Sequence, residues 1–315
     1  MDGVIQHHLS GHPAAPPPSL TPASMPVITL QQLQQAPFAN RLERLELRML
    51  LCHALSLSRT GLITQDQRQI TPNELVHIES LIARREHGEP MAYIIGEREF
   101  YGLAFHVTPA VLIPRPETEL LVELALERLP ANTATPPRLL DMGTGSGALA
   151  VALAHTRPDA QVSALDASHA ALAIATHNAI RHHTTVQFIH SDWYQALPQD
   201  AKFDLIVANP PYIVAGDPHL HQGDLRFEPV DALTDHADGL SSLRQIISGA
   251  PQHLQFGAWL LMEHGYDQAA KVRQLLAQQP FAQIQSWCDL AGIERVSGGQ
   301  LLAAMPSAIG GTHGL

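Results

Sequence analysis

The strongest constraint on the fold is an alternation of apolar, strand-like runs with helical segments that begins at Arg138. When strands alternate with helices along a chain, the strands form a parallel sheet and the helices cover both of its faces. The sequence therefore predicts an α/β fold with a mostly parallel sheet. The expected strands are residues 138–141, 161–165, 186–190, 203–208 and 258–262.

Successive strands of this sheet end in, or are soon followed by, a polar residue that can bind a ligand. These residues are Asp141, Asp166, Asp192 and Asn209. Open α/β sheets bind their ligands at the carboxyl ends of the strands. We therefore expect the four side chains to share one site.

A glycine-rich turn, Asp141-Met-Gly-Thr-Gly-Ser-Gly147, follows the first of these strands, and a helix is expected from Ala148 to His155. Glycine allows positive φ angles and a close approach of the backbone to a ligand. The first turn of a helix offers free N–H groups to an anion. The spacing differs from the G-x-G-x-x-G fingerprint of dinucleotide-binding proteins.

Two further positions complete a nucleoside site in this prediction. Asp166 is placed to accept both hydroxyls of a ribose. Trp193 and its neighbour Asp192 follow the third strand and are placed to flank an adenine ring. The predicted binding residues are Asp141, Met142, Gly143, Thr144, Gly145, Asp166, Asp192, Trp193 and Asn209.

The segment Asn209-Pro-Pro-Tyr212 ends a strand with a rigid backbone, because the two prolines fix their φ angles and lack N–H donors. The Asn209 amide can donate and accept hydrogen bonds, and the Pro210 carbonyl can accept one from a planar nitrogen. Catalytic candidates are Asn209, Pro210 and Tyr212, and substrate-binding candidates are Asn209, Pro210, Pro211 and Tyr212. The alternative is an ordinary strand that ends in a proline turn.

Composition limits the classes of protein to which the chain can belong. The formal net charge of −11 argues against a chain whose main task is to grip a nucleic-acid backbone. Cys52 and Cys288 have no metal-ligand spacing, which favours a reducing compartment. No apolar run reaches the roughly 20 residues that span a bilayer. We expect a cytoplasmic protein without a metal, a membrane segment or direct nucleic-acid binding.

The region before residue 97 has a helical pattern. A helix over residues 41–55 is expected to have one apolar face, made of Leu42, Leu45, Met49 and Cys52. Thr71 and Glu74 are typical of a capping box at the start of a second helix, which should stop at Gly88.

Longer stretches resemble a known family. The order Asp-Met-Gly-Thr-Gly-Ser-Gly, Leu-Asp, Asp-Trp and Asn-Pro-Pro-Tyr resembles class I S-adenosylmethionine-dependent methyltransferases that modify a planar nitrogen. Residues 88–102, 112–119 and 217–229 are similar to the peptide chain release factor glutamine methyltransferases, and the resemblance covers about residues 27–302. Pro-Arg-Pro-Glu-Thr-Glu at 114–119 favours this branch over the related ribosomal-protein methyltransferases, which tend to have Pro-Arg-Ser.

The resemblance implies S-adenosyl-L-methionine as the cofactor and a release factor as the protein substrate. The methyl group would go to the side-chain amide nitrogen, N5, of the glutamine in the Gly-Gly-Gln motif of the release factor. The resemblance also implies an antiparallel strand pair at the end of the sheet, residues 284–288 and 294–302.

Five segments are predicted along the chain. They are a disordered extension (1–26), a helical substrate-recognition domain (27–97), a β-hairpin connector (98–113), the methyltransferase domain (114–305) and a flexible tail (306–315).

Three alternatives stay open. A ribosomal protein is a possible substrate in place of a release factor. A DNA adenine-N6 methyltransferase uses the same tetrapeptide on a flipped base, although it normally needs a basic face and a target-recognition domain. A non-catalytic cofactor-binding scaffold would have no use for Asn209 and Tyr212.

Some residues have two interpretations. Arg115 and Glu119 either contact the methionine end of the cofactor or brace the hairpin. Residues 226–228 either gate the pocket or form a structural loop. Gly298-Gly299-Gln300 repeats the tripeptide that this family methylates, but it lies in an expected strand, so we interpret it as a coincidence.

Overall fold

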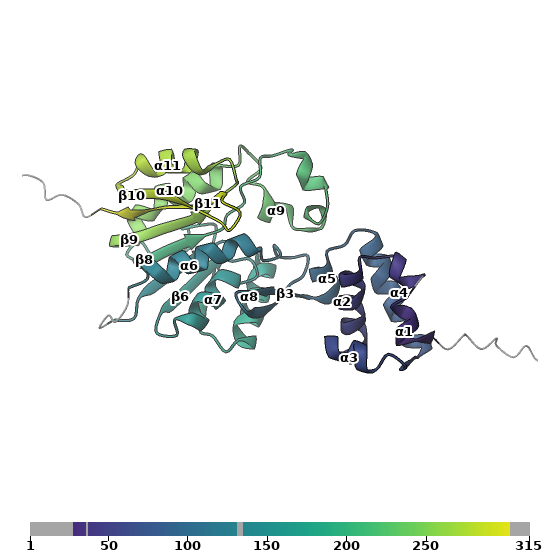
Figure 1. The fold of residues 1–315 in the computed structure, drawn as a ribbon. Coiled ribbons are helices and arrows are strands. Elements are labelled where there is room, and N and C mark those ends of the chain that lie inside the picture. The colour runs from purple at the N-terminus through teal and green to yellow at the C-terminus, as the bar shows by residue number, and fades with distance from the viewer. Residues whose placement is uncertain (1–27, 36, 131–134, 303–315) are drawn as a thin grey trace, which may run out of the picture. The chain divides into compact units, whose positions relative to one another are not determined.

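The computed structural model describes residues 28–35, 37–130 and 135–302, which divide into two compact units between Glu79 and Ser80 (Figure 1). The expected extension at 1–26 and tail at 306–315 lie outside the described residues. The division falls inside a helix and not at residue 97, so the predicted domain boundaries stay a prediction.

The first unit is mainly helical. Thr71 and Glu74 form the expected capping box: Thr71 N–H donates to Glu74 Oε2 (2.9 Å), and Glu74 N–H donates to Thr71 Oγ1 (3.3 Å). The helix that they start crosses into the second unit and ends before Gly88 (φ +89°). The elements are β1 (Ile28–Thr29), α1 (Leu30–Leu33), η1 (Phe38–Asn40), α2 (Arg44–Leu55), α3 (Arg59–Thr64), β2 (Gln69–Ile70) and α4 (Pro72–Glu86).

The predicted apolar face of the helix at 41–55 is wrong. Leu45 is 64% exposed, and the buried residues of α2 are Leu47, Leu50, Leu51 and Leu55. Two apolar stripes are possible in this segment, but α2 begins only at Arg44, so Leu42 lies outside the helix. The stripe that contains four leucines within the helix buries more apolar surface and therefore faces the core.

After the end of α4, the second unit continues with α5 (Met91–Ile95) and an antiparallel hairpin, β3 (Glu97–Phe100) and β4 (Leu103–His106). This confirms the expected hairpin. Phe100 and Phe105 are fully buried and pack edge to face, with ring centroids 6.1 Å apart. Their burial anchors the hairpin against α6 (Glu119–Arg128), which follows the short helix η2 (Pro116–Thr118).

Seven strands form the main sheet in the order β10-β11-β9-β8-β5-β6-β7. β11 is antiparallel to β9 and to β10, which confirms the expected antiparallel pair, and this last strand lies between its two neighbours. The strands are β5 (Arg138–Met142), β6 (Gln161–Asp166), β7 (Val186–His190), β8 (Phe203–Ala208), β9 (Leu254–Glu263), β10 (Phe281–Cys288) and β11 (Glu294–Leu301).

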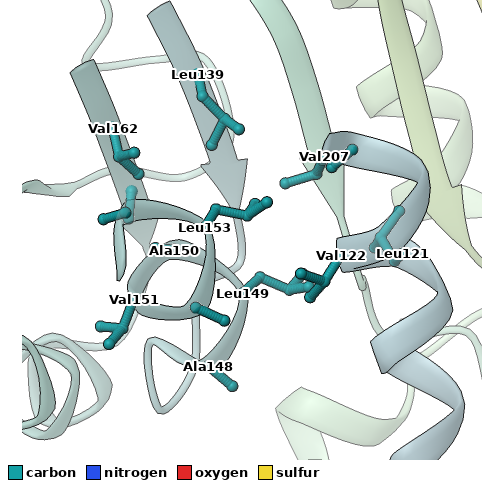
Figure 2. Close-up of a cluster of buried hydrophobic side chains, with 14 of the residues drawn as sticks. Leu121, Val122, Leu139, Ala148, Leu149, Ala150, Val151, Leu153, Val162 and Val207 are labelled. Atoms are coloured by element: carbon teal, nitrogen blue, oxygen red, sulfur yellow. The ribbon is translucent and has the colours of Figure 1, made fainter. Parts of the chain in front are cut away.

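Helices cover both faces of the sheet because successive side chains of a strand point to opposite faces. Leu139 of β5 and Val207 of β8 pack with Leu149 against α6 and α7 (Figure 2). Leu140 and Ile206 are neighbours of these residues in their strands and pack on the other face, against α10 (Ser241–His253) and α11 (Ala269–Ala277). The helices of this region are α7 (Ala148–Thr156), α8 (His169–Arg181), η3 (Pro218–His221), η4 (Leu225–Phe227), α9 (Val230–Leu233), α10 (Ser241–His253) and α11 (Ala269–Ala277).

The tripeptide Gly298-Gly299-Gln300 has a packing role in β11. A methyl group on Gly298 would lie 2.4 Å from the Leu260 carbonyl oxygen, and one on Gly299 would lie 3.0 Å from Phe281 Cβ. The Gln300 amide is also engaged, since its Nε2 donates to the Gly257 carbonyl (2.7 Å). The contacts support the interpretation that the match to the Gly-Gly-Gln motif is a coincidence.

We expect Gly298→Ala to lower the free energy of unfolding by about 1–3 kcal/mol, because the new methyl group overlaps backbone atoms of a neighbouring strand. Gly299→Ala should have a smaller effect, because its nearest contact is 3.0 Å from the new methyl group, compared with 2.4 Å at Gly298. Urea denaturation of both variants checks the order. Equal midpoints for the two variants and the natural protein would show that β11 is not tightly packed on β9.

Candidate active site

Strand register brings the expected site residues to one edge of the sheet. Met142 of β5 pairs with Leu165 of β6 and with Ala208 of β8, which in turn pairs with Met262 of β9. The residues that follow these pairs therefore lie level with one another at the carboxyl edge: Gly143, Asp166, Asn209 and Glu263.

A cavity of about 460 Å³ opens at this edge, within the second unit. The predicted residues that line it are Gly143, Thr144, Gly145, Asp166, Asp192, Trp193, Asn209 and Pro211. Four other predicted residues do not line it: Asp141, Met142, Pro210 and Tyr212. The hairpin and the segment after it contribute further walls that sequence reasoning missed, such as Phe100, Val111 and Leu112.

The glycine-rich turn is held against β6 by its own backbone. The N–H groups of Gly143 and Thr144 both donate to the Leu165 carbonyl (2.9 Å each). Gly147 has φ +82°, and a methyl group there would lie 3.0 Å from Ala175 Cβ in α8. A glycine at this position therefore lets α7 start close to α8, at the floor of the cavity.

Asp166 is positioned by two backbone N–H donors. Its Oδ2 accepts from Gly145 N–H and its Oδ1 from Ser168 N–H, both at 2.8 Å. Burial raises the pKa of the Asp166 carboxyl, and the backbone hydrogen bonds act in the opposite direction. Each carboxylate oxygen keeps a free lone pair, so this residue can accept a pair of neighbouring hydroxyls.

Asp141 lies beneath the cavity and not in its wall. It is completely buried, and its Oδ2 accepts a hydrogen bond from the Thr144 hydroxyl (2.6 Å). Among the described residues, its Oδ1 has no hydrogen-bond partner. Burial raises the pKa of Asp141 to about 7. The observed contact is with the turn, which Asp141 supports from below.

Trp193 stands in a strained turn beside Gly143. Its φ is +45°, and the Ser191 hydroxyl donates to the Trp193 carbonyl (2.6 Å). A methyl group on Gly143 would approach the Trp193 ring at 3.7 Å. The indole is therefore held as a flat wall near the glycine-rich turn.

Asn209 belongs to a buried hydrogen-bonded chain that sequence reasoning missed in part. Its Nδ2 donates to Thr118 Oγ1 (3.1 Å), and the Thr118 hydroxyl donates to Glu263 Oε2 (2.6 Å). The Tyr212 hydroxyl donates to the other oxygen of Glu263 (3.3 Å). Burial raises the pKa of Glu263 to about 7.

A signal for Glu263 was present in the sequence. It directly follows the apolar run 258–262, at the same strand-end position that singled out Asp166 and Asn209. Thr118 lies in the stretch 112–119, in which the sequence analysis assigns candidate roles only to Arg115 and Glu119. The strand-end pattern could have identified Glu263, whereas no pattern singled out Thr118.

The structure shows what the residues with two interpretations contact. Glu119 Oε1 accepts from Tyr101 N–H (2.9 Å) and so braces the hairpin turn. Arg115 lines the cavity and forms an ion pair with the buried Glu228, which also accepts from Ile113 N–H (3.0 Å). Arg226 donates to the His87 carbonyl (2.7 Å).

The residues of the cavity fit a nucleoside with a charged substituent. Asp166 offers acceptors for a ribose diol, Trp193 offers a flat apolar surface, and the glycine-rich turn leaves room for close approach. The cavity volume is within the range of small-molecule sites. These features fit S-adenosyl-L-methionine.

Known proteins share parts of this sequence and its fold. Two protein-family models match the chain: PrmC N-terminal domain over residues 29–96 and Methyltransferase small domain over residues 118–222. Solved structures with a similar fold include a T. thermophilus 16S rRNA N2 G1207 methyltransferase in complex with AdoMet and guanosine (TM-score 0.50, 23% identity, 65% of this chain and 49% of that chain). Another is the hMettl16 catalytic domain in complex with a MAT2A 3'UTR hairpin (TM-score 0.52, 14% identity, 76% and 88%).

Curated relatives are much more similar in sequence. A release factor glutamine methyltransferase of Bordetella pertussis is 53% identical over 82% of this chain and 96% of its own length. Those of Neisseria gonorrhoeae (48% identical, 84% and 95%) and Vibrio cholerae (45% identical, 86% and 93%) match over similar lengths.

The fold and the site define a class I S-adenosylmethionine-dependent methyltransferase. With relatives this similar over nearly their whole length, the chain belongs to the release factor glutamine methyltransferase family.

The described residues lack two features, a metal-ligand cluster and a membrane-spanning helix. Within them, no cluster of three or more His, Cys, Asp or Glu side chains is arranged to hold a metal ion. Nor does any helix of the described ranges have the length and apolar character needed to cross a membrane. The expected absence of a metal stays a prediction.

We expect Asp166→Ala to weaken cofactor binding by about 10- to 150-fold, which corresponds to the loss of one hydrogen bond to a charged group. Isothermal titration calorimetry with S-adenosyl-L-methionine measures this. Asp159→Ala is the matched control, because Asp159 is an exposed carboxylate that pairs with Arg157 (2.7 Å) away from the cavity. An unchanged dissociation constant for the Asp166 variant would remove this residue from the cofactor site.

Proposed function

We propose that this protein methylates N5 of the glutamine in the Gly-Gly-Gln motif of peptide chain release factors, and so acts on the machinery of translation termination. The observation that supports this most directly is that Asn209 lines the same cavity as Asp166 and Trp193. A target amide held by Asn209 would therefore lie in the same cavity as the cofactor.

In this proposal the protein contributes to the reaction by orienting the target amide. The amide nitrogen of glutamine is a weak nucleophile, because its lone pair is delocalised into the carbonyl. Asn209 and the Pro210 carbonyl would hold the nitrogen so that its lone pair points at the methyl carbon, and Tyr212 would pack on the amide plane. Of these three residues, Asn209 is the one that lines the cavity in the structure. Positioning of this kind can contribute roughly 7–11 kcal/mol.

When bound, S-adenosyl-L-methionine supplies a methyl group on a positively charged sulfur. The sulfur would leave with the electrons of its bond to the methyl carbon, as a neutral thioether. The methylated nitrogen then loses a proton to solvent, so no residue of the chain is assigned as a general base. The role of the site is to align the two reactants and to exclude water.

The cofactor residues of this proposal are Asp141, Met142, Gly143, Thr144, Gly145, Asp166, Asp192, Trp193 and Asn209. Asp141 acts beneath the turn, through Thr144, and Met142 is part of the core under it. The other residues in this set line the cavity directly. Pro211 lines it beside Asn209, in the substrate-binding segment.

The rival substrates can be separated by one assay. Labelled cofactor is incubated with the protein and with a release factor, a large-subunit ribosomal protein or duplex DNA. Transfer to the release factor supports the proposal, whereas transfer only to another substrate overturns it. The proposal also places the protein in the cytoplasm, where release factors act, without direct contact to nucleic acid.

We expect Asn209→Ala to lower kcat by at least about 10²-fold, which is typical for the loss of a hydrogen bond that acts in the transition state. Cofactor affinity should change little. Asn73→Ala is the control, because Asn73 is exposed on α4. If cofactor affinity falls as much as kcat does, Asn209 is a cofactor residue and not a catalytic one.

The helical segment at 27–97 is proposed to dock the release factor, since Asn209 and its neighbours can recognise an amide but cannot distinguish one glutamine from another. We expect a shortened chain that begins at Ser80 to keep its cofactor affinity, because the buried Phe100 and the hydrogen bond from Tyr93 to the Val111 carbonyl (2.6 Å) are retained. It should lose most of its activity on intact release factor. Calorimetry and circular dichroism verify folding, and full activity of the folded, shortened chain would contradict the docking role.

A further inference from the structure

A buried carboxylate, Glu263, is connected to the catalytic amide of Asn209 through a single hydroxyl group. Thr118 Oγ1 lies 2.6 Å from Glu263 Oε2 and 3.1 Å from Asn209 Nδ2. Glu263 is 2% exposed and Thr118 is 5% exposed, so water does not replace these contacts. All three residues belong to the second unit.

The chemistry of these three groups fixes which one donates in each of the two hydrogen bonds. A carboxylate can only accept hydrogen bonds, and a hydroxyl group has one hydrogen to donate. The hydrogen of Thr118 therefore goes to the ionised Glu263, and Thr118 can only accept from Asn209. The end of the Asn209 amide that faces Thr118 must then be the NH2 group, and the oxygen Oδ1 must face away from Thr118.

The direction matters for a substrate whose nitrogen carries two hydrogens. Oδ1 of Asn209 and the Pro210 carbonyl are both acceptors, and together they match the two N–H groups of a primary amide. If the Asn209 amide were reversed, its NH2 group would face the N–H groups of the substrate, and two donors repel each other. The orientation of the Asn209 amide thus decides whether the pair can hold the substrate nitrogen.

We propose that Thr118 and Glu263 are positioning residues, which lock the Asn209 amide in the orientation that presents Oδ1 to the substrate. The proposal rests on the proposed catalytic role of Asn209. Tyr212 is part of the same device, because its hydroxyl donates to the second oxygen of Glu263 (3.3 Å). Glu263 therefore fixes the polar ends of both Asn209 and Tyr212.

Protonation of Glu263 would release this lock. A protonated carboxyl can donate to Thr118, and Thr118 is then free to donate to Asn209 Oδ1, so the reversed amide becomes satisfied. Burial is the main cause of the raised pKa of Glu263, about 7, and Glu117 of η2 adds to it. Thr118, Tyr212 and Arg295 of β11 act in the opposite direction. The ionised, locked form therefore predominates above pH 7, and kcat should fall as the pH drops below 7.

A double-mutant cycle tests the lock. Thr118→Val keeps the shape of the side chain and removes the hydroxyl, and we expect kcat to fall about tenfold to a hundredfold, in the range that misplacement of a catalytic group produces. Cofactor affinity should stay within about threefold, and Thr118→Ser should restore most of kcat, because serine keeps the hydroxyl group. In the Asn209→Ala background, Thr118→Val should have no further effect, since residues that act through one another are not additive.

Two outcomes of the cycle would overturn the proposal. One is a normal kcat for Thr118→Val while Asn209→Ala is slow, which leaves the role of Asn209 intact. The other is an additive loss in the double variant, which means that Thr118 acts independently of Asn209. If Asn209→Ala itself retains full kcat, the proposed catalytic role of Asn209 is wrong, and a positioning role for Thr118 and Glu263 no longer follows from it.

Glu263→Gln tests the carboxylate separately. Glutamine has the same shape but only one acceptor oxygen and does not titrate. We therefore expect a lower kcat for this variant. We also expect the loss of the acid limb, which is the fall of kcat below about pH 7. Glu123→Gln, on the exposed side of α6, is the matched control and should keep the limb. Thermal unfolding verifies that each variant is folded. An acid limb that persists in Glu263→Gln would assign it to another group, such as Asp141, and would overturn the role of Glu263.

Discussion

The register of the parallel strands around β5 is the constraint on which the site depends. β5 pairs with β6 on one side and with β8 on the other, and β8 pairs with β9, so one row of residues crosses the sheet at its carboxyl edge. Asp166, Asn209 and Glu263 are in that row. A shift of any strand by one residue would turn its side chain to the opposite face, so the packing of both apolar layers fixes the positions of the polar groups.

The carboxyl groups at this edge are buried, and burial disfavours their ionised forms. Burial raises the pKa of Asp141 and of Glu263 to about 7 and also raises that of Asp166. A carboxyl with a higher pKa in the folded protein than in the unfolded chain binds an additional proton on folding. Its ionisation therefore lowers stability as the pH rises from about 4 to about 7. The fold tolerates this because hydroxyl and backbone donors, such as those of Thr144 and Thr118, stabilise the charge locally.

Local patterns are enough to predict the strands, the capping box at Thr71 and, apart from Asp141, the cavity residues at the strand ends, because periodicity and turn chemistry act over a few residues. The face of α2 was not predicted correctly, because two apolar stripes overlap there and the start of the helix decides between them. Thr118 was also missed. Its partners Asn209 and Glu263 lie 91 and 145 residues further along the chain, and only the assembled sheet brings them together.

The segment at 217–229, which follows Asn209-Pro-Pro-Tyr212, shows how long-range contacts complete the cavity wall. Glu228 reaches back to Ile113 N–H and Arg115, and Arg226 reaches the His87 carbonyl. A methyl group on Gly88 (φ +89°) would lie 1.8 Å from the Arg226 guanidinium, so a side chain at this position would displace the end of Arg226. The observed contacts of residues 226–228 are those of a structural loop. Since Arg115 itself lines the cavity, this anchoring fixes one wall of the site from a segment more than a hundred residues away in sequence. Glu228 therefore positions a cavity residue, Arg115, from outside the row of strand ends that supplies Asp166 and Asn209.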